Sequence, residues 1–80
     1  MEHDWMFAGS AQKDEPFEIK GVDVWSQGWQ VIEGQEAQVH DPVYGKAYIF
    51  RVFCIEHDDQ KIEFAAGEFS SGTWGFYTRA

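Results

Sequence analysis

One stretch, residues 46–64, constrains the fold more than any other part of the chain. It reads KAYIFRVFCIEHDDQKIEF and contains one β-rich run, 46–56, and most of a second, 61–66, joined by the polar segment 57–60. Val, Ile, Phe and Tyr dominate the first run, whereas a helix would favour straight-chain residues and a period near 3.6. We therefore predict a β-hairpin over this stretch.

Both faces of the first hairpin strand are apolar. One face carries Tyr48, Phe50, Val52 and Cys54, and the other carries Ala47, Ile49, Phe53 and Ile55, interrupted by Arg51. A sheet with one solvated face would alternate apolar and polar residues instead. We expect this strand to be covered on both sides, by an N-terminal arm, a turn of helix or a second subunit. A homodimer is therefore one arrangement that the pattern predicts.

Further strands are predicted wherever short apolar runs lie between turn signals. These runs cover residues 17–24, 29–33, 37–40 and 73–78. A parity change at Gly21 indicates a bulge or sharp bend, and Gly34 separates the second run from the third. Turns are expected at 26–28, 41–45 and 70–72, and Gly67 is expected to bend the chain.

These elements predict one all-β domain over residues 1–80. Five or six antiparallel strands with closely spaced turns indicate a meander that forms a small sandwich or a partly open barrel. Residues 1–10 are expected to be an edge strand or an arm whose aromatic residues dock on the core. Eighty residues leave no room for a second domain.

The net charge of −8, from 14 acidic and six basic residues, disfavours two classes of partner. Nucleic-acid binding needs a basic footprint, and an anionic membrane surface attracts basic segments. The sequence therefore predicts no direct contact with nucleic acid or membrane. Cys54, the single cysteine, is expected to be a buried, inert thiol. With no signal-peptide pattern and no long apolar run, the cytoplasm is the expected compartment.

The sequence offers little support for catalysis or a metal site. Each of the three histidines precedes an aspartate, at positions 3, 40 and 57, but their spacing matches no specific metal motif. We interpret these pairs as turn chemistry. No nucleophile motif or phosphate-cradling loop is present, so we expect no enzyme activity, no metal and no cofactor.

Binding of a protein partner is the function we expect. The candidate contact residues are two tryptophans that flank a turn and three nearby acids: Asp23, Trp25, Trp29, Glu33 and Glu36. Tryptophan is enriched at interface hot spots, and carboxylates complement a basic surface. We expect an acidic module that inhibits or regulates a basic protein, such as one that binds nucleic acid, as immunity, antitoxin-like or mobile-element antagonist proteins do. The alternatives are a small-ligand or carbohydrate binder that uses the tryptophans, and a homo-oligomeric assembly subunit.

Overall fold

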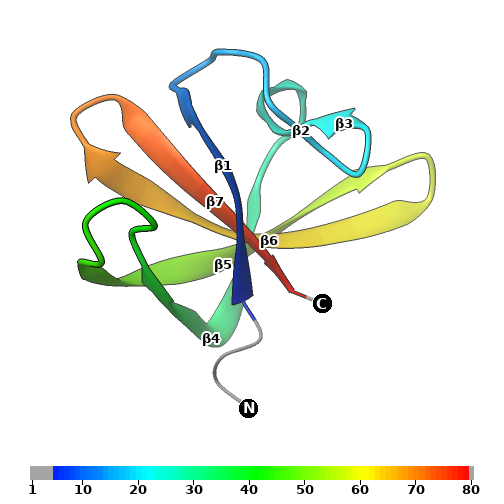
Figure 1. Cartoon of the computed structure of the whole chain (residues 1–80). Coiled ribbons are helices and arrows are strands. Elements are labelled where there is room, and N and C mark those ends of the chain that lie inside the picture. The colour runs from blue at the N-terminus through cyan, green and yellow to red at the C-terminus, as the bar shows by residue number, and fades with distance from the viewer. Residues whose placement is uncertain (1–4, 80) are drawn as a thin grey trace.

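The computed structural model describes residues 5–79, which form a five-stranded antiparallel sheet and a two-stranded one (Figure 1). The large sheet contains β1 (Trp5–Gln12), β4 (Gln30–His40), β5 (Ala47–His57), β6 (Gln60–Ser70) and β7 (Thr73–Arg79). The small sheet pairs β2 (Glu18–Ile19) with β3 (Val22–Asp23), and a 3-10 turn, η1 (Val24–Ser26), follows it. The strand order of the large sheet is β1-β7-β6-β5-β4. The prediction of an all-β antiparallel fold is confirmed.

The central hairpin is formed by β5 and β6. His57 pairs with Gln60, so only Asp58 and Asp59 make the turn, with φ of 50° and 65°. Two residues with positive φ match the right-handed twist of the flanking strands, and aspartate tolerates this conformation. The predicted hairpin is confirmed, although its second strand is longer than expected. β6 passes through Gly67 and ends at Ser70, so the expected bend at Gly67 is wrong.

Gly67 serves packing within the sheet. It lies opposite Gly75 on β7, and a Cβ at Gly67 would approach the ring of Phe50 to 2.5 Å. A Cβ at Gly75 would likewise meet the ring of Phe69. The glycine pair therefore leaves room for two aromatic rings to lie against the backbone of the sheet.

β4 contains a wide bulge. The pairing passes from Val31 opposite Phe53 directly to Glu36 opposite Arg51, so residues 32–35 face Val52 alone. Gly34 has a φ of 80°, a conformation that glycine adopts without steric cost. The two short strands predicted before and after Gly34 are thus one strand whose middle leaves the ladder.

One face of the sheet is covered by the segment between β1 and β4. Its buried cluster combines residues of this segment with residues of the sheet: Ile19, Val22 and Val24 pack with Ala11, Ile55, Ile62, Phe64, Ala66 and Phe76. The small hairpin turns at Lys20 and Gly21, both with positive φ, which confirms the bend predicted at Gly21. A turn of helix, η1, is therefore part of the cover expected for β5.

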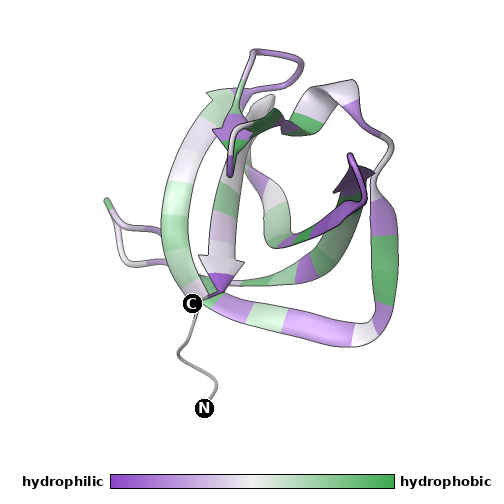
Figure 2. Ribbon diagram, turned by 90° about the vertical axis from the view of Figure 1, so that its right-hand side faces the viewer, coloured by the Kyte–Doolittle hydropathy of each residue, from purple (hydrophilic) through white to green (hydrophobic). Residues whose placement is uncertain are grey.

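The other face is covered by the curvature of the sheet itself. Figure 2 shows the strands curving around a common interior. The buried cluster on this face combines residues from β4, β5, β6 and β7: Ala37, Val39, Phe50, Val52, Ala65 and Tyr77. From β1, the ring of Phe7 contacts that of Tyr77, with centroids 5.4 Å apart. β1 is the edge strand expected within residues 1–10, of which 1–4 lie outside the described part.

Candidate functional site

The structure divides the five candidate contact residues into two groups. Asp23, Trp25 and Trp29 belong to the layer that covers the sheet. Glu33 and Glu36 lie at the bulge of β4 and are exposed. The expected site is therefore not a single cluster, and its two parts have different surroundings.

Asp23 is a capping residue. Its Oδ1 accepts hydrogen bonds from the backbone N of Trp25 at 3.0 Å and from that of Phe17 at 3.5 Å. It precedes η1, where a side-chain acceptor satisfies an amide that the short helix leaves free. These contacts hold the covering segment in place, so the Asp23 carboxylate already has partners within the fold.

Trp25 and Trp29 are half-buried and stack on one another, with ring centroids 5.1 Å apart. The ring of Trp29 also lies 5.0 Å from those of Phe53 and Phe64. Its Nε1 donates a 2.7 Å hydrogen bond to the carbonyl of Val24. Both tryptophans therefore contribute to packing, and only part of each ring remains available to a ligand.

A third tryptophan completes the cluster from β7. Trp74 packs perpendicular to Trp25 and Trp29, at 5.8 and 5.7 Å, on the same face as Phe76. Tyr77 belongs to the opposite cluster, as the alternation of β7 predicts. The Nε1 atoms of Trp25 and Trp74 are buried and have no hydrogen-bond acceptor within residues 5–79.

The bulge of β4 opens a hollow of about 370 Å³ on the surface. Its lining consists of one continuous segment, residues 31–36, together with Arg51 of β5. Glu33 and Glu36 form no ion pair or side-chain hydrogen bond with another residue in the range 5–79. Gln35 is anchored, because its Oε1 accepts a 3.2 Å hydrogen bond from Arg79. The bulge therefore presents two carboxylates that pair with no other residue of the described range, beside a fixed amide and Arg51, which lies opposite Glu36.

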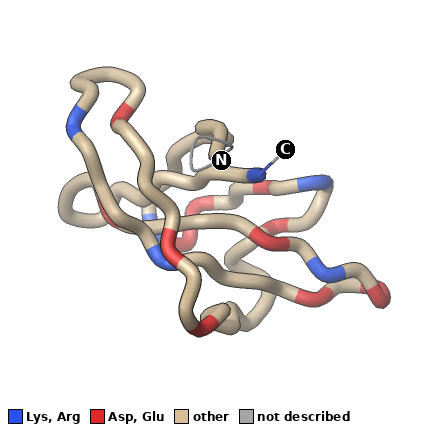
Figure 3. The backbone as a smooth tube through the Cα atoms, turned by 90° about the horizontal axis from the view of Figure 1, so that it is seen from below, with Lys and Arg blue, Asp and Glu red and all other residues tan. Residues whose placement is uncertain are grey.

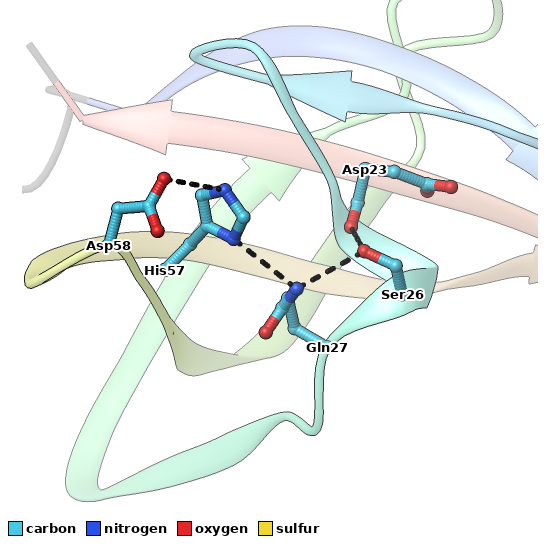
Figure 4. Close-up of polar contacts among 5 residues, drawn as sticks. All are labelled: Asp23, Ser26, Gln27, His57 and Asp58. Carbon is cyan, nitrogen blue, oxygen red and sulfur yellow. Dashed lines mark hydrogen bonds and ion pairs between the residues drawn. The ribbon is translucent and has the colours of Figure 1, made fainter.

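A polar network connects the covering segment to the turn of the central hairpin (Figure 4). Gln27 Nε2 donates to Ser26 Oγ at 3.3 Å and lies 3.5 Å from Nδ1 of His57. Nε2 of His57 lies 3.2 Å from Oδ2 of Asp58. Ser26 Oγ donates to the carbonyl of Asp23 and not to the imidazole. The arrangement therefore lacks the nucleophile–base contact of a hydrolase and instead links two surface turns.

Within residues 5–79, charged residues occur on many segments and do not gather on one side (Figure 3). In the described part, no three His, Cys, Asp or Glu side chains are grouped so that they could hold a metal ion. The pair at residues 3 and 4 lies outside that part. Residues 5–79 contain no helix that is both long and apolar enough to cross a bilayer. Cys54 is buried, with 6% of its surface exposed, as predicted.

Comparisons with known proteins give no relative from which to transfer a function. No protein-family model matches the chain, and searches of curated proteins and of solved structures find no significant match.

One exposed surface, at the end of the β4–β5 hairpin, is not among the sites that the sequence predicts. Val43 and Tyr44 in its loop are 75% and 85% exposed, and Ile49 on β5 is 64% exposed. The loop was interpreted only as a turn, and Ile49 only as part of an apolar face. The available signal was the pair of large apolar residues between Pro42 and Gly45, where polar residues are usual.

Proposed function

We propose that the protein is an interaction module that inhibits or regulates a basic partner protein by binding it directly. The observation that carries this proposal is the bulge of β4. It exposes Glu33 and Glu36, neither of which pairs with another residue in the described part, beside a hollow of about 370 Å³. A lysine or arginine of a partner can enter such a hollow and pair with the carboxylates.

The net charge of −8 supports a basic partner over a neutral one. Long-range attraction raises the association rate of oppositely charged proteins, and short-range pairing fixes their orientation. A protein that binds nucleic acid has a surface of this kind, and carboxylates can occupy its phosphate sites. Occupation of that surface excludes the nucleic acid, which gives the module an inhibitory mechanism without chemistry of its own.

The carbohydrate alternative has weaker support. A sugar needs an open aromatic face, whereas Trp25 and Trp29 stack on each other and on the core. Asp23 is similarly engaged, since it accepts backbone hydrogen bonds from Phe17 and Trp25. We therefore assign the partner contact to Glu33 and Glu36 and a supporting role to the other three residues.

The test is affinity capture from a lysate of the source or its host, with wild-type protein and two charge-matched double variants. One carries Glu33→Lys and Glu36→Lys at the bulge. The other carries Glu18→Lys and Glu63→Lys, which changes the net charge equally at two exposed positions elsewhere. We expect one stoichiometric basic protein with wild type and with the control, and its loss with the bulge variant. Binding should weaken as salt is raised, because salt screens exposed charges.

Two results would contradict the proposal. Equal loss in both double variants would mean that net charge alone, and not the bulge, attracts the protein. Capture that is unchanged at high salt would remove the electrostatic argument. Far-UV circular dichroism of each variant separates a binding defect from a folding defect.

A further inference from the structure

The three most exposed large apolar side chains in residues 5–79 lie on one hairpin. They are Tyr44 (85% exposed), Val43 (75%) and Ile49 (64%), all within the β4–β5 unit. Ile49 lies opposite Gln38 on β4. It is on the same face of β5 as Ile55, which the covering segment buries, but the covering segment does not extend as far as Ile49. Exposed apolar groups gathered in one place indicate a docking surface.

The outer part of this hairpin, residues 38–49, is also electrically neutral. It contains one acid, Asp41, and one cation, Lys46, so the net charge of −8 resides in the rest of the chain. A neutral surface gives a basic partner no electrostatic advantage. For a second copy of the same acidic chain, it is the surface where the two molecules repel each other least.

A hollow of about 350 Å³ lies next to the loop. Its lining combines residues near the end of β4 with residues near the start of β5: Gln38, Val39, His40, Ala47, Tyr48 and Ile49. Its volume is large enough for the ring of a tyrosine, given that small-molecule pockets begin at about 300 Å³. Tyr44 and the hollow therefore form a protrusion and a recess on the same hairpin.

We propose that two copies of the chain form a symmetric dimer through this hairpin, in which Tyr44 of each copy occupies the hollow of the other. In an isologous interface, each contact occurs twice, so a protrusion next to its own complementary recess suits two-fold symmetry. The interface leaves the covered faces of the sheet unchanged.

The test is sedimentation velocity of the full chain over a wide concentration range, at low salt and at about 0.5 M salt. We expect a monomer–dimer equilibrium that strengthens with salt, because salt screens the repulsion between two acidic chains. Tyr44→Ala and Ile49→Asp should each weaken the dimer about tenfold or more, as hot-spot residues do. Met6→Ala is the matched control: Met6 is 56% exposed, but it lies on β1.

A monomer at every concentration would overturn the proposal. Equal weakening by Met6→Ala would also overturn it, since it would indicate unspecific apolar association. Tyr44 is exposed, so Tyr44→Ala should leave the thermal midpoint unchanged and remain interpretable. The salt dependence separates this dimer from the basic partner proposed above, because binding of that partner weakens with salt and depends on Glu33. Either proposal can therefore fail without the other.

Discussion

The hydroxyl of Tyr77 on β7 donates a 2.6 Å hydrogen bond to the backbone carbonyl of His40, the last residue of β4. The two strands are separated by β6 and β5 in the sheet, so this bond crosses the interior that the curvature encloses. Tyr77 is only 3% exposed. Burial, followed by the negative charge of Asp41 and the nearby Tyr48, raises the pKa of Tyr77 to about 12.

This pKa predicts a loss of stability at alkaline pH. An unfolded chain releases the phenol proton near pH 10, whereas the folded chain holds it until about pH 12. The native state therefore binds more protons between these values, and the free energy of unfolding falls as the pH rises through this window. A shift of two pKa units corresponds to about 3 kcal/mol. Urea unfolding at a series of pH values measures the slope.

Tyr77→Phe tests the assignment. At neutral pH the variant should be less stable than wild type by about 1 kcal/mol, because it lacks one part-buried hydrogen bond to the carbonyl of His40. Above pH 11 the order should reverse, since phenylalanine carries no proton to lose. If the free energy of unfolding falls equally steeply between pH 10 and pH 12 in the two proteins, a group other than Tyr77 causes the alkaline loss of stability.

Gly67→Ala should destabilise the fold by about 1–3 kcal/mol, the usual cost of overpacking. The new methyl group would lie 2.5 Å from the ring of Phe50, so either the ring or the strand must move. Gly28→Ala is the matched control, because a Cβ at Gly28 meets no atom within 4 Å. Thermal unfolding of both variants provides the comparison. Equal midpoints would mean that the sheet accommodates the methyl group at no cost.

Asp23→Ala should lower the free energy of unfolding by about 1–2 kcal/mol, since it removes an acceptor at the start of η1. Trp25 follows the cap and packs on the core, so its fluorescence should shift to longer wavelength as the segment loosens. Ser26→Ala is the control for a substitution in the same turn. Because Ser26 is exposed, this variant should lose less stability than Asp23→Ala. If the Asp23→Ala protein is as stable as wild type and its fluorescence is unchanged, the Asp23 carboxylate does not stabilise η1.

Substitution of Trp25 and of Trp29 by phenylalanine should lower the free energy of unfolding by different amounts. Trp29→Phe removes ring area and the 2.7 Å hydrogen bond to Val24, whereas the Nε1 of Trp25 has no acceptor among the described residues. Removal of an unsatisfied donor is nearly neutral, while an orphaned carbonyl is costly. We expect Trp29→Phe to cost about 1 kcal/mol more than Trp25→Phe in urea unfolding. The opposite order would contradict the hydrogen-bond assignment.

Local patterns predicted the strands well because each strand carries its own signal. The run around Phe50 is β-branched and aromatic, and the alternation of β7 separates Trp74 and Phe76 from Tyr77. Gly67 shows where such reasoning fails. A glycine within a strand indicates either a bend or a close approach, and only the ring of Phe50, 17 residues earlier, decides between them.

The candidate site was less predictable, because exposure depends on contacts between distant segments. Trp25 and Trp29 flank a turn in sequence, yet they pack on rings from β5, β6 and β7. Ile49 belongs to an apolar run, yet the covering segment does not extend to it, so it remains exposed. Periodicity assigns a residue to a face of a strand, but the length of the layer above that face decides its burial.

The pairing of β1 with β7 also has a consequence for biosynthesis. Trp5 lies opposite Arg79, so β1 leaves the ribosome long before β7, the strand that pairs with it in the sheet (Figure 1). Until then, the aromatic side chains of β1 have no interior to enter, and chaperones have access to them. Co-translational folding can begin with the meander from β4 to β6, but closure of the sheet by β1 must await the emergence of β7. A nascent chain arrested before β7 should therefore remain sensitive to protease at its N-terminal strand.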